Sequence, residues 1–194
     1  MHCKIDHGTP RVKIIEEVRL ICDTQSTGSP FLSYSDDDYQ TWSTPREFDI
    51  TGQNPERNAR LGLTRTFQIV QPFAAQTVRE NIAVGAHLHL ASRAQALAQA
   101  EAVAQQVGLA PQLDKLAGEL TVAGRKRLEL ARALATRPRL LLLDEVLAGL
   151  NPQEIADMIP VVQGIVRSGV TVLMIEHVMQ AVMGLASQVW VLAQ

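Results

Sequence analysis

The fold is decided by the stretch Arg139-Leu-Leu-Leu-Leu-Asp-Glu-Val-Leu-Ala-Gly-Leu-Asn-Pro152. Its four consecutive leucines are too few to span a membrane. The run also lacks the alternating polar residues that a strand with one solvent-exposed face would have. Pro138 stands before the stretch, and Gly149 follows the leucines within it. A short apolar run bounded in this way predicts a central strand that is buried on both faces of a parallel sheet.

Two carboxylates, Asp144 and Glu145, directly follow the predicted strand. Open parallel sheets hold their ligands at the carboxyl ends of the strands, and a carboxylate there is costly to desolvate unless it binds a cation or handles a proton. One hypothesis is nucleotide hydrolysis, in which Asp144 holds Mg²⁺ directly or through water and Glu145 polarises the attacking water. The alternative is an exposed pair that ends the strand and caps the next turn, and this motif alone does not separate the two.

Composition sets the bounds of the problem. The chain has 194 residues, of which 46% are hydrophobic, and this suits one globular domain. Eighteen basic and 20 acidic residues give a formal charge of −2, which argues against a nucleic-acid partner but allows a local phosphate site. Cys3 and Cys22 have no metal-ligand spacing, and a reducing, cytoplasmic compartment is expected. No apolar run approaches the ~20 residues of a membrane helix.

The texture of the chain changes near residue 48. Residues 1–48 are polar and rich in turn residues, and only residues 12–21 have enough apolar content for one strand or a short helix. Beyond them, alternating apolar patterns imply an α/β domain with a mostly parallel sheet. Further strands are predicted at 60–68, 170–175 and 188–192. Helices are predicted at 77–86, 92–107, 124–136 and 152–167, and a last helix follows His177 and ends near residue 186.

Several helix boundaries carry recognisable signals. Thr77 and Glu80 have the spacing of a capping box, Ser92 is placed to cap the next helix, and Gly108 to end it. Pro160 is expected to kink or split the helix at 152–167. The helix at 124–136 is predicted to bury one apolar face and to leave its charged residues largely off that face. The apolar face comprises Leu128, Ala131, Leu134 and Ala135, and the charged residues are Arg125, Lys126, Glu129 and Arg132.

These motifs together resemble the ATPase subunits of ABC transporters. The run Leu120–Leu134 followed by the leucine strand is similar to their signature helix and Walker B motif. Residues 148–151 fall where that family has its D-loop, His177 matches its switch histidine, and Gln68 matches its Q-loop glutamine. The stretches 49–52, 60–68 and 148–152 resemble one subgroup, the ATP-binding subunits of branched-chain amino-acid importers.

The resemblance implies a P-loop-NTPase-like ABC ATPase domain over residues 49–194, with a helical subdomain at roughly 72–134 and an atypical segment at 1–48. It implies that ATP and Mg²⁺ are the cofactors, that Glu145 and His177 are catalytic, and that Asp144 and Gln68 contact the metal. Thr121, Ala123 and Gly124 would contact the nucleotide of a second ATPase subunit in a head-to-tail dimer. Thr121 could equally be a helix N-cap and nothing more, or serve both purposes.

The sequence also departs from the family. A phosphate-binding loop of the form GxxxxGK places a lysine after a glycine, and no Gly-Lys pair occurs in this chain, whose lysines are Lys4, Lys13, Lys115 and Lys126. The stretch Cys22–Gly28, where the loop is expected, has Asp23 instead. In the signature, Ala123 replaces a glycine, and Val146 stands where a proline is common.

By resemblance, the chain is a peripheral protein on the inner face of the cell membrane, where it couples ATP hydrolysis to transport through permease subunits. The alternatives are a catalytically inactive interaction subunit that pairs with an intact ATPase, or a truncated gene remnant without a P-loop. Under a related hypothesis, residues 1–48 are not the native N-terminal part of such a protein.

Overall fold

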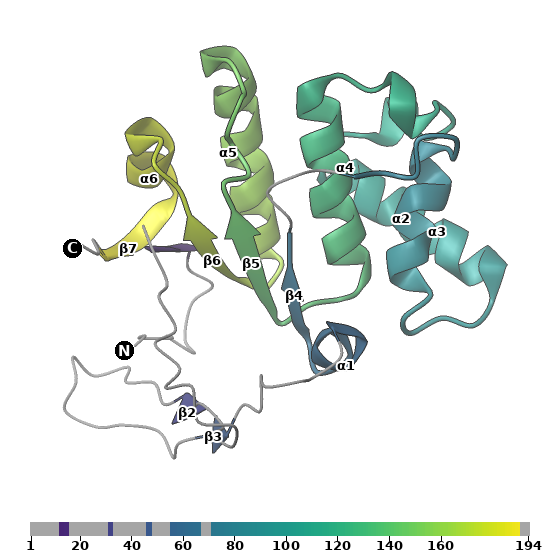
Figure 1. Ribbon diagram of the computed structural model, residues 1–194, viewed down its shortest axis with the longest axis horizontal. Coiled ribbons are helices and arrows are strands. Elements are labelled where there is room, and N and C mark those ends of the chain that lie inside the picture. Colours follow the sequence, from purple (N-terminus) through teal and green to yellow (C-terminus); the bar gives the residue numbers. More distant parts are fainter. Residues whose placement is uncertain (1–11, 16–30, 33–45, 48–54, 67–70, 191–194) are drawn as a thin grey trace.

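The computed structural model describes residues 12–15, 31–32, 46–47, 55–66 and 71–190. Its main feature is a five-stranded sheet in the order β4-β5-β6-β1-β7, in which every neighbouring pair is parallel (Figure 1). The five strands are β1 (Val12–Ile15), β4 (Leu63–Arg65), β5 (Leu140–Asp144), β6 (Thr171–Ile175) and β7 (Ala186–Trp190). A separate antiparallel pair consists of β2 (Phe31–Leu32) and β3 (Arg46–Glu47).

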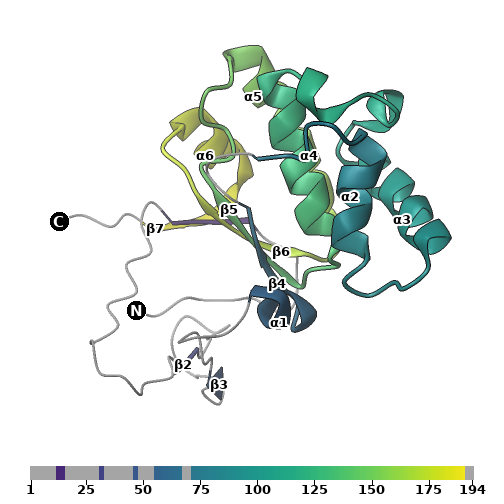
Figure 2. The same ribbon diagram turned by 45° about the vertical axis from the view of Figure 1, so that its right-hand side comes forward.

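Helices pack beside this sheet in two groups. Figures 1 and 2 show α2, α3 and α4 gathered on one side of the molecule, with α5 and α6 nearer β5, β6 and β7. The helices are α1 (Pro55–Arg60), α2 (Val78–Ala86), α3 (Arg93–Gln106), α4 (Val122–Ala135), α5 (Pro152–Arg167) and α6 (Met179–Leu185), with 3₁₀ turns at Ala110–Gln112 and Ala117–Glu119. The predicted α/β class with a mostly parallel sheet is confirmed. The division at residue 48 and the helical subdomain at roughly 72–134 remain predictions.

The leucine strand is β5, and it lies between β4 and β6. Leu141 and Leu143 are 0% and 1% exposed, whereas Leu140 and Leu142 are half-buried. The strand prediction is therefore confirmed, but the expected burial on both faces is not, because only alternate residues of β5 are fully buried. The strand at 170–175 is confirmed as β6, and the last strand begins at Ala186, two residues earlier than expected.

The structure confirms some of the predicted helix boundaries and contradicts one. Thr77 and Glu80 form the expected capping box at the start of α2. Ser92 occupies the N-cap position of α3, but its exposed side chain makes no capping hydrogen bond, so that part of the prediction is wrong. Gly108 follows this helix with a φ of 74°, a left-handed conformation that glycine adopts without strain.

The structure differs from expectation at two other helices. Pro160 does not split α5, which runs unbroken from Pro152 to Arg167, and the proline is exposed on its outer side. Because proline has no backbone N–H, it leaves one helical carbonyl unpaired. This destabilises the helix least where solvent can donate to that carbonyl. Helix α1 was not predicted at all, although Pro55 begins it and Glu56 pairs with Arg60 one turn later.

Helix α4 buries more of its surface than predicted. It begins at Val122 and is capped by Thr121, whose hydroxyl accepts a hydrogen bond from the backbone N–H of Gly124. The predicted apolar face is buried, but so are Lys126 and Glu129, at 8% and 9% exposure. The prediction for these two was wrong because α4 packs against α2 and α3 and also reaches the ends of the strands.

Helices α2 and α4 approach closely at Gly85. A Cβ atom at this position would overlap the carbonyl oxygen of Arg132, so any side chain other than hydrogen would push the two helices apart. Arg132 also extends toward the chain that precedes α2: its guanidinium lies 5.0 Å from the centre of the Phe73 ring and donates to the carbonyl of Gln71.

Asn81 on α2 holds the preceding loop in place. Its side chain is 0% exposed, its Oδ1 accepts from the N–H of Phe73, and its Nδ2 donates to the carbonyls of Phe73 and Thr77. These bonds satisfy backbone groups that would otherwise lack partners beside the helix.

Replacing Asn81 with alanine should therefore lower the free energy of unfolding by about 2–3 kcal/mol, since several buried groups lose their partners together. Chemical denaturation of the variant measures this loss. The exposed Gln105→Ala on α3 serves as the control and should change stability little. An Asn81→Ala variant as stable as the unaltered chain would contradict the assigned role.

Candidate functional site

The site lies where β4, β5 and β6 end side by side. The backbone N–H of Asp144 donates to the hydroxyl of Thr66 at 3.2 Å, and the carboxylate accepts from the guanidinium of Arg65 at 2.6 Å. The Asp144 side chain is 19% exposed, so it opens to solvent at the edge of the sheet while its backbone stays in the β5–β6 ladder. This is the edge at which open parallel sheets bind ligands.

The residues present fit a hard divalent cation. Mg²⁺ binds through one or two carboxylates together with water and substrate phosphates rather than through a full protein cage. Asp144 offers such a carboxylate, and Arg65 shows that a positive charge is accommodated beside it. The part of the chain that the structure describes contains no group of three or more acidic, histidine or cysteine side chains that would hold a metal alone.

Glu145 has an unusual backbone conformation. Its φ is +45°, a left-handed value that costs a residue with a side chain about 1–2 kcal/mol. Hydrogen bonds on both of its sides hold it there. Its N–H donates to the carbonyl of Ile175 at 3.0 Å, and its carbonyl accepts from the Lys126 ammonium at 3.2 Å and from the N–H of Ala148 at 3.1 Å. Residues held in strained conformations by such contacts cluster at functional sites.

His177 faces Glu145 from the end of the neighbouring strand. The distance from His177 Nδ1 to Glu145 Oε1 is 3.8 Å, and the two side chains are 66% and 30% exposed. They are too far apart for a direct hydrogen bond, but close enough for the charge on one to act on the other. The structure thus places three of the predicted site residues, Asp144, Glu145 and His177, at neighbouring strand ends, while their roles stay predictions.

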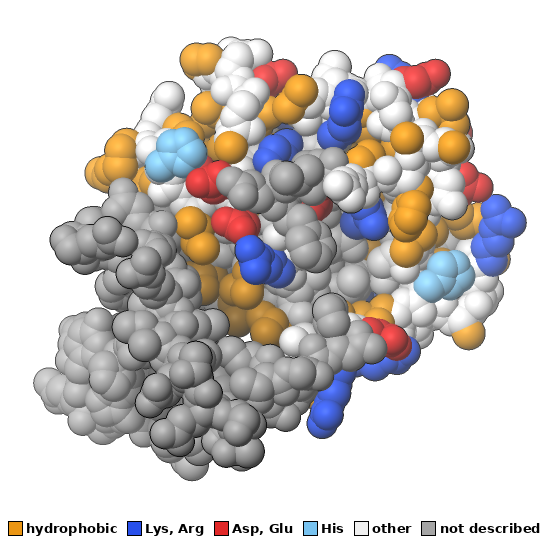
Figure 3. Space-filling model, viewed as in Figure 1, with side chains coloured by type: hydrophobic (Ala, Val, Ile, Leu, Met, Phe, Trp, Pro, Cys, Tyr) orange, Lys and Arg blue, Asp and Glu red, His pale blue; other side chains and the backbone are white. Residues whose placement is uncertain are grey.

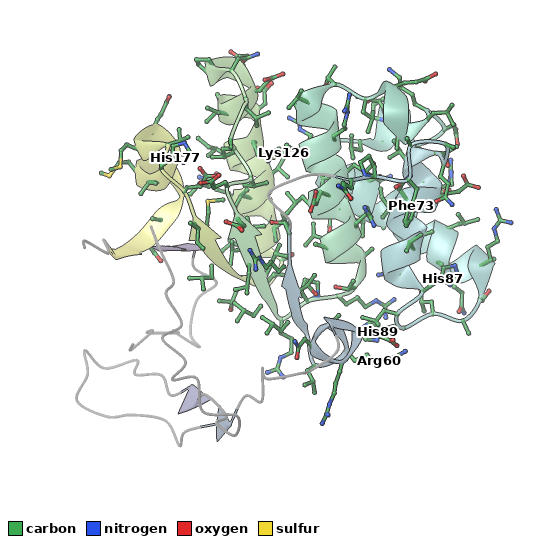
Figure 4. The ribbon with its side chains drawn as sticks, in the orientation of Figure 1. Arg60, Phe73, His87, His89, Lys126 and His177 are labelled. Carbon is green, nitrogen blue, oxygen red and sulfur yellow. The ribbon has the colours of Figure 1, made fainter. Side chains whose placement is uncertain are left out.

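In Figure 4, Lys126 lies on the α4 side and His177 on the α6 side of the ends of β5 and β6. Figure 3, in the same orientation, shows acidic and basic side chains together on this face of the molecule. The exposed fractions of His177 and Glu145 indicate that both side chains reach the surface of the described residues.

Glu176 lies behind this face. It is 2% exposed, and its Oε1 accepts from the N–H of Leu147 at 2.8 Å, while Oε2 makes no hydrogen bond among the described residues. Burial raises the pKa of Glu176 above its ordinary value of 4.5, and the hydrogen bond from Leu147 opposes that rise. Glu176 thus ties the end of β6 to the turn that follows Glu145.

The other predicted site residues either lie away from these strand ends or fall outside the described residues. Thr121, Ala123 and Gly124 stand at the start of α4, one turn before Lys126, and the Thr121 hydroxyl caps the helix. Gln68 lies outside the described residues, as does the stretch 22–28 in which a phosphate-binding loop was sought.

Four residues that shape the site were not predicted as site residues from the sequence. Arg65 and Thr66 at the end of β4 contact Asp144, and Lys126 and Glu176 contact the turn that begins at Glu145. The predicted strand at 60–68 includes Arg65 and Thr66, but the sequence did not indicate that this strand pairs with β5, so their contact with Asp144 was not expected. Nothing in the local sequence indicates that Lys126 is buried.

The comparison with protein-family models decides the family. The model described as "ABC transporter" matches residues 37–148, which include β5 and Asp144–Glu145. The chain belongs to the ABC transporter family.

Curated relatives agree with this ABC assignment. The high-affinity branched-chain amino acid transport ATP-binding protein LivG of Salmonella typhimurium is 33% identical over 167 residues, which cover 78% of this chain and 66% of LivG. BraF of Pseudomonas aeruginosa, which has the same description, is 37% identical over 163 residues, covering 75% of this chain and 64% of BraF. The methionine import ATP-binding protein MetN of Rhizobium etli is 33% identical over 149 residues. The chain thus spans just under two thirds of the length of LivG and BraF.

Solved structures show the same ABC fold. A nucleotide-free ATP-binding cassette from an ABC transporter matches with a TM-score of 0.64 and 28% identity, over 75% of this chain and 62% of the cassette. A cassette solved in its ADP conformation matches equally well, over 77% of this chain. Among the described residues, no helix has both the length and the apolar character needed to cross a membrane.

The raised pKa of Glu176 predicts a pH-dependent stability. Below pH 4.5 the carboxyl is protonated in both the folded and the unfolded chain. As the pH rises further, the unfolded chain loses this proton first, so Glu176 lowers the free energy of unfolding by up to about 1.4 kcal/mol per pH unit until the folded pKa is passed. Glu176→Gln keeps an oxygen that accepts from the N–H of Leu147, but its amide does not titrate, so this pH-dependent loss of stability is absent. The free energy of unfolding of the glutamine variant relative to the unaltered chain should therefore rise with pH, and parallel pH profiles would contradict the prediction.

Proposed function

We propose that this chain is the ATP-binding and ATP-hydrolysing subunit of an ABC importer for branched-chain amino acids. The observation that carries the proposal is the meeting of Asp144, Glu145 and His177 at neighbouring strand ends, with 3.8 Å between the imidazole and the second carboxylate. Similarity to LivG and BraF supports the choice of solute class, since both are described as branched-chain amino acid transport proteins. Similarity to MetN, a methionine import protein, is consistent with amino-acid import more broadly.

In this proposal each site residue has one task. Asp144 would hold Mg²⁺, which supplies charge stabilisation at the phosphates when bound. To do so, its carboxylate must exchange Arg65 for the metal, and the exposed guanidinium has room to move away. Glu145 would accept a proton from the attacking water, and His177 would donate a hydrogen bond toward the terminal phosphate. Gln68 is assigned to the metal or the water by resemblance alone.

Assembly follows from the same hypothesis. Thr121, Ala123 and Gly124 would contact the nucleotide of a second ATPase subunit in a head-to-tail dimer, where the start of α4 offers backbone N–H groups to an anion. Permease subunits in the membrane would be driven by this dimer. The chain would then act in the cytoplasm, attached to the inner face of the membrane through those subunits.

A second candidate rests on a specific observation. None of the four lysines, Lys4, Lys13, Lys115 and Lys126, follows a glycine, so the sequence has no P-loop lysine to balance the phosphate charge. Under this candidate function, the chain is an inactive subunit that offers its signature helix to an intact ATPase. Purification with and without such a partner separates the two functions.

The deciding experiment is calorimetry of Mg-ATP binding to the purified chain beside Glu145→Gln. If the proposal holds, both should bind with micromolar affinity, about −8 kcal/mol, since the substitution keeps the size of the side chain. Hydrolysis by the variant should fall by about 10²–10⁴-fold, the usual contribution of a general base. Glu56→Gln, an exposed glutamate on α1, is the matched control and should hydrolyse at the unaltered rate. Absence of binding at millimolar nucleotide would reject the ATPase and favour the inactive subunit.

A further inference from the structure

Lys126 is a buried charge that the proposed mechanism does not use. It lies on α4 with 8% of its surface exposed, and its ammonium donates to the backbone carbonyl of Glu145 at 3.2 Å. An ammonium group is strongly hydrated, so removing it from water costs free energy that its interactions in the protein must offset. A backbone carbonyl is an acceptor that the ammonium can hold only while Glu145 keeps its present orientation.

The carbonyl in question belongs to the residue with the strained backbone. At a φ of +45°, the Cβ of Glu145 crowds its own backbone, and the chain would relax to an ordinary conformation if nothing prevented it. The N–H is held by the carbonyl of Ile175 on one side, and the carbonyl is held on the other side by Lys126 and by the N–H of Ala148 within the turn. The contacts of Ile175 and Lys126 come from two different elements, β6 and α4, and they hold the two peptide units that flank the Cα atom of Glu145. Only the contact from Lys126 ties the second of these peptide units to α4.

We propose that Lys126 is a positioning residue that keeps Glu145 in its left-handed conformation and so aims the carboxylate toward His177. The direction of the Cα–Cβ bond follows from the backbone dihedral angles, and the 3.8 Å separation from His177 depends on that direction. The inference rests on the proposed function only where it gives Glu145 a catalytic role. The structural part stands on the contact itself.

Lys126 also connects the start of α4 with the turn at Glu145. Thr121 caps α4, and Lys126 lies on the same helix less than two turns further on. Because an α-helix is stiff over this length, a displacement of the start of α4 moves the ammonium and with it the peptide at Glu145. A contact at Thr121 can therefore change the aim of the carboxylate without touching it.

The first test is amide hydrogen exchange in three variants of the full chain, followed residue by residue with NMR. Lys126→Met keeps the buried stem and removes the donor, Lys126→Arg restores a donor, and Lys115→Met removes an exposed lysine as the matched control. Lys126→Met removes one hydrogen bond from the Glu145 carbonyl, so the two amides that depend on the conformation of Glu145 should exchange about tenfold faster. These are the Glu145 N–H, which donates to Ile175, and the Ala148 N–H, which donates to the Glu145 carbonyl. Both amides should be protected in the other two variants. Unchanged exchange in Lys126→Met would overturn the proposal.

Activity gives an independent measurement. If the unaltered chain hydrolyses ATP, Lys126→Met should lower kcat by about tenfold at unchanged KM, and Lys126→Arg should recover most of the rate. An equal kcat in Lys126→Met would overturn the link from Lys126 to Glu145. If the unaltered chain hydrolyses no ATP, the proposed function fails, while the exchange experiment still decides whether Lys126 positions Glu145.

Loss of folding in Lys126→Met is also informative. Glycine adopts a positive φ without strain, so adding Glu145→Gly should recover thermal stability if Lys126 acts by holding a strained peptide. Recovery in the double variant, with no comparable gain when Glu145→Gly is added to Lys115→Met, would support the proposal. A double variant as unstable as Lys126→Met alone would mean that the lysine only fills space, and would overturn it.

Discussion

The pairing of β5 with a parallel strand on each side is the constraint on which the site depends. Leu140 to Asp144 lie in register with Thr171 to Ile175 of β6, and Leu63 to Arg65 of β4 pair with Leu140 to Leu142. All three strands therefore end at one edge and release their next residues into the same volume. Burial of Leu141 and Leu143 stabilises this strand by about 1.5–3 kcal/mol each.

Three carboxylates share this edge, and each has a different environment. Asp144 pairs with a guanidinium, Glu145 faces an exposed imidazole, and Glu176 is buried with its pKa raised. Such differences let chemically similar groups behave differently at one pH, which is the usual basis for assigning distinct roles in a catalytic site. The buried Glu176 has a structural role, because its carboxylate oxygen accepts from the N–H of Leu147 and holds the turn there.

Much of this arrangement could be predicted from local patterns, and the rest depends on contacts between distant segments. The leucine run indicated β5, and the spacing of Thr77 and Glu80 indicated the start of α2, because both signals lie within a few neighbouring residues. The burial of Lys126 could not be predicted in this way. Its environment is supplied by a peptide 19 residues away, and helical periodicity places it among solvent-facing charges. Helix α1 was missed for a related reason, since its six residues are too few to show a clear period.

The close approach at Gly85 has a mechanical consequence. Helices that meet through side chains can slide past each other as rotamers change, but the contact with the Arg132 carbonyl is one of backbone against backbone and has no such slack. Helices α2 and α4 should consequently behave as a single stiff lever. Force applied to the outer surface of α2, where Val84 is 45% exposed, would be transmitted to α4 with little loss to internal deformation.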